Sequence, residues 1–534
     1  MMWLFIAIII CMSQSISSMS PSTEQVADLV HANSLLRTEN ADLKHQLEWF
    51  RRQIFGKKSE RRPLDLSDNQ QMNLMELPSP VDGTAAPGKT VAAHTRRAKA
   101  PAREGGDGSN LFFDEKQVPV EVIAVPNHET DGLSPEDYDV IGEKISHRLA
   151  QRPGSYVVLK YVRPVIKRRD TAAISCPPAP QGVIEGSRAD VSFVAGMLVD
   201  KFAYHQPLYR LYLRLSDRGI KVSRGWLTQL THAAIDLLVP IHAAQLESIR
   251  QSRVKAMDET PIKAGRTGPG KLRSAYFWPL YGERDEVSFL YFPTRAARNV
   301  EDALGLSPPE KSVLLSDGYS AYSHYARKTG ITHAQCWTHT RRLFFEAQKI
   351  EPERAAHALD LIGKIYQVEA KIRELDLGST AKRAYRITHA RPLVTQFFAW
   401  IAVQFDHQGL LPSSPLTKAM AYARERRTGL EVFLDDPDVP ADTNHLERAL
   451  RVIPMGRKNW NFCWTEIGAE YVGVIQSLVV TCRLHDIDPY DYLVDVLQRI
   501  SEHPASKVEQ LTPRLWKQYC ADNPLRSDLH KFNG

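Results

Sequence analysis

Three acidic residues that lie far apart in the chain have the setting of catalytic carboxylates: Asp258, Asp317 and Glu447. Asp258 and Asp317 each follow a short apolar run, at 254–257 and 313–315. Such runs predict buried strands, and carboxylates at the carboxyl ends of strands often line a site. For Asp317 a structural role is an equal alternative, because an aspartate at this place also caps the helix that follows.

Three convergent carboxylates would repel one another strongly. Two unit charges about 4 Å apart cost on the order of 4 kcal/mol at an effective dielectric constant of 20, so either a carboxylate takes up a proton or a cation binds. All-oxygen ligands suit Mg²⁺ or Mn²⁺ rather than zinc. Two such ions would activate a water or a 3′-hydroxyl and stabilise the leaving oxygen of a phosphodiester. We therefore predict phosphoryl transfer on nucleic acid, with all three acids as catalytic residues and metal ligands, and with Glu259 facing solvent or supporting the site rather than binding metal.

The residues around Asp258 and Asp317 predict an α/β domain. Aromatic, β-branched or apolar runs predict five strands, at 254–257, 272–281, 287–292, 313–315 and 331–337. Helices are expected at 295–304 and 319–328. Three meandering strands followed by alternating helix and strand describe a ribonuclease H-like mixed sheet. The first and fourth strands are neighbours in that order, which would bring the two aspartates together.

Glu447 lies in ADTNHLERALRVI, which has the pattern of an amphipathic helix. Its polar side covers an arc of about 100° and consists of Asn444, Glu447, Arg448 and Arg451. The opposite side is apolar and consists of Leu446, Ala449, Leu450 and Ile453. We expect Glu447 on a polar face among arginines. Four basic residues are candidates for contact with a phosphate backbone, with a solvated face as the alternative: Arg448, Arg451, Arg457 and Lys458.

The bulk composition predicts a globular protein of several domains. The chain has 534 residues, whereas single cores stop growing at roughly 250–300 residues. Its formal charge of +6 is too small to argue for nucleic acid by itself, although basic residues cluster at 51–62 and 160–169. These clusters either bind phosphates or form solvated faces. Six scattered cysteines without a Cys-x-x-Cys pair argue against a disulfide framework and favour the reducing cytoplasm.

The amino-terminal region divides into three predicted segments. Residues 1–18 hold an apolar run too short to span a bilayer, and we favour a start codon assigned too far upstream, with export as the alternative. Residues 22–62 carry a heptad with Asn33 and Asn40 at two "a" positions, which favours a parallel coiled-coil homodimer over a lone amphipathic helix. Residues 63–110 are rich in Pro, Gly, Ala and polar residues and predict a flexible linker.

The rest of the chain is expected to hold a small β-containing module at 111–190 and a helix-turn-helix at 191–250. Arg224, Trp226 and Gln229 lie near the start of the candidate recognition helix, although two helices joined by a turn are also ordinary in a helical core. A catalytic domain, a helical insertion within it and a helical tail are then expected, at 251–342 with 435–482, at 343–434 and at 483–534.

Six segments together resemble the transposases of the insertion sequence 66 family, over about residues 20–500: KFAYHQPLYR, MDETPIK, SDGYSAY, CWTHTRRLFF, DTNHLERALR and GRKNWNF. The resemblance implies that Asp258, Asp317 and Glu447 form the DDE triad of a cut-and-join enzyme with a ribonuclease H-like domain. It also implies a helical insertion before the last acid and accessory proteins encoded by the same mobile element.

The segment 333–342 holds a further group of candidates. His333, Cys336 and His339 have the spacing of a metal site but lack a fourth ligand. The resemblance implies instead that Cys336 and His339 belong to a Cys-x-x-His signature close to the active site. His339, Arg341 and Arg342 are then candidates for contact with DNA.

The sequence departs from the family pattern in two places. The family often has a cysteine-rich zinc segment before the helix-turn-helix, where this chain offers only His128, His147 and Cys176, so we predict no zinc. The family's usual Asp-Asn-Asn is Asp-Thr-Asn at 442–444 here, which leaves Glu447 in place but puts the role of the middle residue in question.

The leading hypothesis is a DNA transposase that binds the terminal inverted repeats of a mobile element and cleaves and joins strands with two Mg²⁺ or Mn²⁺ ions. Its expected partners are double-stranded DNA and a second copy of the chain, with no membrane. The alternative is a non-catalytic DNA-binding regulator or an inactive relic. A glycoside hydrolase, a third possibility, would need two acids and no metal.

Overall fold

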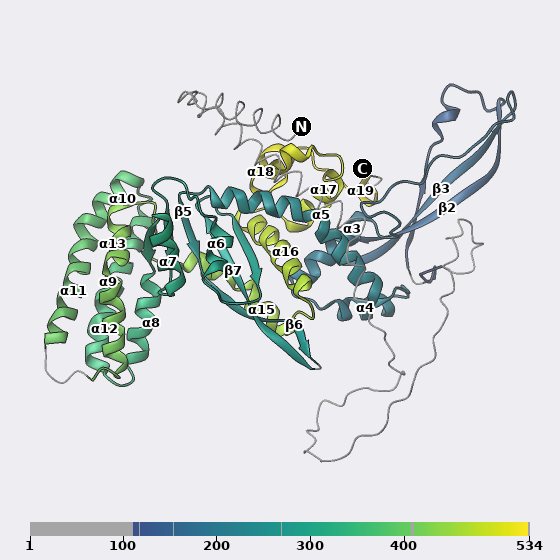
Figure 1. The fold of residues 1–534 in the computed structure, drawn as a ribbon. Coiled ribbons are helices and arrows are strands. Elements are labelled where there is room, and N and C mark those ends of the chain that lie inside the picture. Colours follow the sequence, from purple (N-terminus) through teal and green to yellow (C-terminus); the bar gives the residue numbers. More distant parts are fainter. Residues whose placement is uncertain (1–110, 117, 153, 269, 407–410, 532–534) are drawn as a thin grey trace, which may run out of the picture. The chain divides into compact units, whose positions relative to one another are not determined.

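The computed structural model describes residues 111–116, 118–152, 154–268, 270–406 and 411–531 (Figure 1). The predicted segments 1–18, 22–62 and 63–110 lie outside the described residues. Residues 1–102 and 103–534 form two separate units, and everything described below belongs to the second.

One long hairpin dominates the first sheet. Strands β2 (Tyr138–Arg152) and β3 (Ser155–Arg168) pair antiparallel along their whole length. Two short strands pair with β3: β1 (Val120–Ala124) runs parallel to it, and β4 (Ile174–Ser175) antiparallel. A 3-10 turn, η1 (His128–Thr130), follows β1. Helix α3 (Val191–Leu198), which continues as the π-helix η2 (Val199–Ala203), packs against β2.

A pair of helices follows where the sequence predicts one. Helix α4 (Leu208–Asp217) ends in a turn with Gly219, and α5 (Arg224–Arg250) begins where the Ser223 hydroxyl accepts a hydrogen bond from the Trp226 N–H at 3.0 Å. α5 is 27 residues long, because apolar residues continue at helical spacing far beyond the turn. Its buried side packs against strands and helices further along the chain. Most of the candidate recognition helix is therefore a core helix.

The central sheet holds six strands: β5 (Val254–Met257), β6 (Thr260–Gly268), β7 (Lys271–Gly282), β8 (Val287–Phe292), β9 (Val313–Ser316) and β10 (Thr332–Gln335). β10, β9 and β5 run parallel, and β7 pairs antiparallel with β5, β6 and β8. β5 and β6 lie along the same side of β7 and are separated only by residues 258 and 259. The predicted strands exist, but β6 was missed because its segment TPIKAGRTG has neither an aromatic nor a β-branched run.

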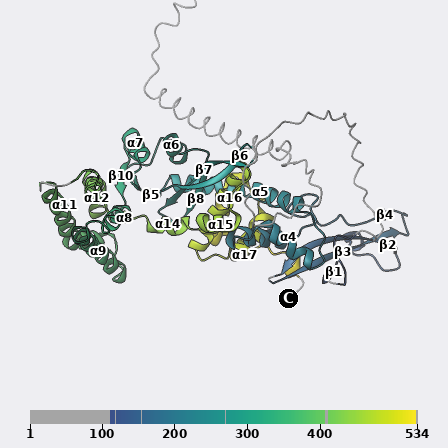
Figure 2. The ribbon, with the colours of Figure 1, turned by 90° about the horizontal axis from the view of Figure 1, so that it is seen from below.

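Helices cover this sheet. α6 (Arg298–Leu304) and α7 (Ser320–Thr329) flank β9 in the chain, and α6 begins three residues later than predicted. α16 (Glu466–Leu484) packs against β8 and α5, as Figure 2 shows. Gly473 permits this contact, since a Cβ there would lie 2.3 Å from the Phe289 carbonyl oxygen. α16 has the length and composition of a membrane span, but 67% of it is buried inside the protein, as in an ordinary core helix.

Along the chain, a bundle of helices lies between β10 and the segment that carries Glu447 (Figure 1). Its members are α8 (Trp337–Ala347), α9 (Pro352–Glu374), α10 (Ser379–Tyr385), the π-helix η3 (Arg386–Ala390), α11 (Arg391–Asp406), α12 (Pro415–Glu425) and α13 (Arg427–Asp435). Arg386, only 1% exposed, pairs with Glu369 and donates to the carbonyl oxygens of Phe433 and Val439. This buried guanidinium fixes the path by which the chain leaves the bundle.

The last helices return to the central sheet and complete the unit. They are α14 (Asn444–Leu450), α15 (Val452–Trp460), α17 (Pro489–Arg499), the 3-10 helix η4 (Ala505–Leu511), α18 (Pro513–Tyr519) and α19 (Asp528–Lys531). Arg253, at the start of β5, forms ion pairs with Asp436 and Asp438 at 2.7 Å each. These pairs tie the returning segment to the sheet.

Candidate active site

Asp258 and Asp317 follow neighbouring parallel strands. β5 pairs with β9 so that Ala256 lies opposite Leu315, and each aspartate comes two residues later, directly after its strand ends. Parallel strands end at the same edge of a sheet, so the two carboxylates belong to one edge. The Asp258 N–H donates to the Pro279 carbonyl oxygen of β7 at 3.3 Å, which fixes its backbone between two strands.

The Asp258 carboxyl is electrostatically unusual. Its pKa is raised to about 7, first because burial disfavours the charged form and then because the carboxylates of Glu259 and Asp317 repel it. The Glu259 N–H, which donates to Asp258 Oδ1 at 2.7 Å, and His339 act in the opposite direction. A raised pKa is the expected result when a carboxyl group is buried beside other carboxylates.

Glu259 does not face solvent, because its side chain is only 4% exposed. The Arg295 guanidinium donates to its Oε1, through Nε at 2.8 Å and through Nη2, and the Tyr322 hydroxyl donates to its Oε2 at 2.6 Å. Arg295 also lies over the Tyr319 ring at 4.2 Å. Of the two settings expected for Glu259, exposure to solvent is wrong and a supporting position fits these contacts, whereas its absence from the metal ligands remains a prediction.

The Asp317 turn is shaped by the helical bundle. Asp317 Oδ1 accepts a hydrogen bond from the Tyr319 N–H at 2.9 Å, just before α7. Gly318 lies so close to α12 that a Cβ would meet Arg426 at 2.5 Å and Tyr422 at 2.6 Å. Arg426 donates to the Gly318 carbonyl oxygen at 3.2 Å. Asp317 therefore organises the turn before α7, and one of its carboxylate oxygens has no part in that turn.

Glu447 occupies the polar face of α14, as expected. Leu446 and Ala449 are buried, while Arg448 and Arg451 are exposed. Glu447 Oε1 is buried without a hydrogen-bond partner among the described residues. Such an oxygen is costly unless something pairs with it. Its chemistry fits a cation ligand.

Two contacts with α8 hold the start of α14. The Thr443 hydroxyl lies 3.2 Å from Cys336 Sγ, and the Thr443 N–H donates to the same sulfur at 3.3 Å. Both residues are buried, at 1% and 2% exposure. Asp442 accepts from the Asn444 N–H at 3.0 Å and from its Nδ2 at 2.6 Å. The middle residue of Asp-Thr-Asn is therefore a packing contact with the cysteine of the Cys-x-x-His segment.

The other histidines of this region have different surroundings. His339 lies near enough to Asp258 to affect its pKa, and its Nδ1 is buried without a hydrogen-bond partner in the described part of the chain. His333 Nε2 lies 2.8 Å from the Ser316 hydroxyl, and burial lowers the pKa of His333 to about 4. In the described part of the chain, no three or more His, Cys, Asp or Glu side chains are grouped closely enough to hold a metal ion. The three acids are thus not a closed ligand set in this structure.

The zinc-segment residues lie in separate settings. His128 contacts Asp131 at 3.0 Å and is largely exposed, whereas His147 Nε2 is buried without a partner among the described residues. The Cys176 thiol donates to the Pro177 carbonyl oxygen at 3.6 Å.

The candidate DNA contacts also differ in their settings. Arg224 is exposed and lies 5.7 and 5.9 Å from the ring centres of Tyr209 and Tyr212. Trp226 stacks on Phe193 at 5.8 Å, so it contributes to packing. Arg457 donates to the carbonyl oxygen of Pro261 in β6. The other exposed candidates are Gln229, Arg341, Arg342, Arg448, Arg451 and Lys458.

The residues that support the two aspartates were not identified from the sequence. Arg295 comes from the loop before α6 and Tyr322 from α7, whereas Tyr422 and Arg426 both come from the end of α12. The only available signal was the cluster of three arginines at 424–427. Cationic and aromatic residues are too common for such a cluster to identify a contact.

Comparison with known proteins now gives the family. Residues 186–471 match the model described as Transposase IS66 family, residues 477–514 match the IS66 C-terminal element, and residues 42–106 match the model described as Transposase C of IS166 homeodomain. Similar proteins include the uncharacterized proteins y4hP, y4jD and y4qI of Sinorhizobium fredii, which are 27%, 28% and 28% identical. The matches cover 90%, 89% and 93% of this chain and 89%, 94% and 92% of theirs. The first of the three models covers more than half of the chain, and the chain therefore belongs to the IS66 family of transposases.

Proposed function

We propose that this protein binds the terminal inverted repeats of its mobile element and catalyses metal-dependent cleavage and joining of DNA strands. Asp258, Asp317 and Glu447 are its catalytic carboxylates. One observation carries the proposal: two carboxylates follow neighbouring parallel strands, and burial and acidic neighbours raise the pKa of one of them to about 7. A buried carboxyl group with acidic neighbours is typical of sites that work with bound cations.

The domain that carries these acids is ribonuclease H-like in this proposal. The strand order β8-β7-β5-β9-β10, with β7 antiparallel to both neighbours and the last three strands parallel, supports it. Helices α9 to α13 of the bundle are the insertion that precedes the third acid.

The three carboxylates would hold Mg²⁺ or Mn²⁺ ions, which supply an activated water or 3′-hydroxyl and stabilise the leaving oxygen. Asp258 and Asp317 provide charge at the sheet edge, and the unpartnered Oε1 of Glu447 provides a third donor. Arg295 and Tyr322 donate hydrogen bonds to the two carboxylate oxygens of Glu259. In this proposal these bonds keep the Glu259 carboxylate directed away from the reacting atoms. Thr443 and Cys336 position the helix that carries Glu447.

The exposed basic residues of α8, α14 and α15 are proposed to contact the DNA backbone, together with the first turn of α5. Dimerisation through residues 22–62, accessory proteins of the same element and a cytoplasmic location complete the proposal.

The test uses labelled duplexes that carry the DNA bordering the gene. Wild-type protein should cleave or join them in Mg²⁺ or Mn²⁺, and EDTA should abolish both reactions. Asp258→Ala should bind the duplex but not cleave it, while the control Asp522→Ala, at an exposed position, should do both. Binding without cleavage by the wild type would favour the regulator or relic.

A further inference from the structure

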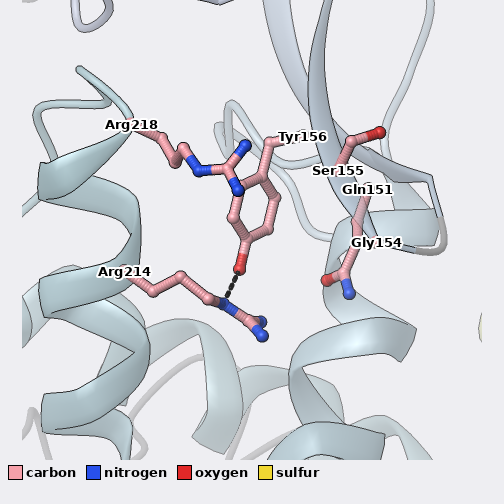
Figure 3. Close-up of a pocket in the computed structure, with 6 residues that line it drawn as sticks. All are labelled: Gln151, Gly154, Ser155, Tyr156, Arg214 and Arg218. Carbon is pink, nitrogen blue, oxygen red and sulfur yellow. Dashed lines mark hydrogen bonds between the residues drawn. The ribbon is translucent and has the colours of Figure 1, made fainter.

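A small pocket lies between the β2–β3 hairpin and α4, outside the proposed active site (Figure 3). Gln151, Tyr156, Arg214 and Arg218 line it, with Gly154 and Ser155 at the tip of the hairpin. Its volume is about 60 Å³. One water-sized group needs roughly 10–15 Å³ by this measure, so the pocket has room for about four such groups, as in a tetrahedral oxyanion.

The polar groups of this pocket are mainly hydrogen-bond donors. Tyr156 is 8% exposed, and its hydroxyl oxygen accepts from Arg214 Nε at 2.7 Å, which leaves the hydroxyl proton available. The side chains from the helix and from the hairpin reach toward the same space in Figure 3. The Gln151 amide can donate as well, because its Nε2 carries two protons. An anion is the ligand that such a set of donors prefers.

The charge of the pocket is also unbalanced. Asp200 pairs with Arg214 and offsets its charge. Arg218 has neither an ion pair nor a side-chain hydrogen bond among the described residues, and it is exposed. The net charge of these three groups is therefore positive, and Arg218 is the group free to pair with a ligand.

The position of the pocket indicates the source of the anion. α4 packs against α5, whose first two turns carry the exposed Arg224 and Gln229. In a helix-turn-helix, the first helix crosses the DNA backbone while the start of the second faces the bases. We propose that this pocket binds one phosphate of the DNA backbone, with Arg218 as the ion-pair partner and Tyr156 as a hydrogen-bond donor. This proposal rests on the proposed DNA binding of the protein.

The experiment measures binding of a labelled random-sequence duplex to the full-length protein by fluorescence anisotropy at several salt concentrations, in EDTA. Loss of one phosphate contact should make the slope of log K against log salt concentration less steep by about 0.9. At 0.1 M salt this change corresponds to about eightfold weaker binding. Arg218→Ala should show this loss for all sequences alike. The matched control is Arg210→Ala, which is also exposed and lies on α4 but outside the pocket, whereas Arg218 directly follows α4; the slope of this control should not change.

Tyr156→Phe provides a second variant that keeps the ring packed near Phe193. It should lower affinity without changing the slope, because it removes a donor and no charge. Equal slopes for wild type and Arg218→Ala, or equal losses in Arg218→Ala and Arg210→Ala, would overturn the proposal.

Inorganic phosphate distinguishes the source of the ligand. If phosphate raises the melting temperature of the wild type but not of Arg218→Ala, and the DNA slope is unchanged in that variant, the pocket holds free phosphate and the DNA assignment is wrong. A wild-type protein that binds no duplex at all would instead refute the proposed function. Because EDTA prevents cleavage, these outcomes do not depend on catalysis.

Discussion

Asp258→Asn should stabilise the metal-free protein at alkaline pH. The pKa of Asp258 is about 7 in the folded protein and 3.8 for an ordinary aspartate, so the folded state keeps a proton that the unfolded state has lost. Folding stability from this group is therefore complete below about pH 4, falls as the pH rises to about 7 and stays low above it. At 1.36 kcal/mol per pH unit, the wild type loses about 4 kcal/mol across this range. Asparagine has nearly the same shape and carries no charge, so the variant avoids this loss.

The assay compares melting temperatures of wild type and Asp258→Asn in EDTA at pH 5 and pH 8. A difference of about 4 kcal/mol corresponds to roughly 4 °C for a cooperative unit of this size, with most of it present at pH 8. Mg²⁺ should raise the melting temperature of the wild type at pH 8 and leave the variant almost unchanged, since a cation that binds the folded state stabilises it. The control Asp522→Asn, at an exposed position, keeps Asp258 and should respond to pH and Mg²⁺ as the wild type does. If the stability gained by Asp258→Asn over the wild type is no larger at pH 8 than at pH 5, the pKa of Asp258 is not raised in the folded protein and the reasoning is wrong.

Three further predictions concern the supports of the site. Glu447→Gln should abolish cleavage of end-bearing duplexes but retain duplex binding in anisotropy; a variant that still cleaves at the wild-type rate would remove Glu447 from the triad. Gly318→Ala should destabilise the protein by about 1–3 kcal/mol and reduce cleavage, since the new Cβ would lie 2.5 Å from Arg426. The control Gly363→Ala in α9, which has open space around it, should be neutral or stabilising in the same melting assay. Glu369→Gln should lower the free energy of unfolding by about 3–5 kcal/mol because it leaves the buried Arg386 unpaired. Asp360→Asn, which breaks an exposed pair with Lys364 on the same helix, should lower it by at most about 1 kcal/mol. Equal losses for the two variants in chemical denaturation would contradict this account.

Local sequence patterns were enough to predict the positions of the main elements. The apolar runs before Asp258 and Asp317 are strands that end where the charges begin. The helical spacing around Glu447 predicted which of its neighbours are buried. These features depend on how apolar and polar residues alternate within a short stretch of chain, and this alternation can be read directly from the sequence.

Tertiary structure decided which groups surround those residues. β6 forms because its backbone pairs with β7, although its own residues have weak strand propensity. Glu259 is buried because Arg295 and Tyr322 reach it from segments 36 and 63 residues away. The long α5 is a core helix because α16, more than 200 residues later, covers it. Contacts of this kind depend on partners that are distant in the chain, and no local period contains them. The sequence alone thus determined where the acids lie on their elements, and only the fold determined their partners and their pKa values.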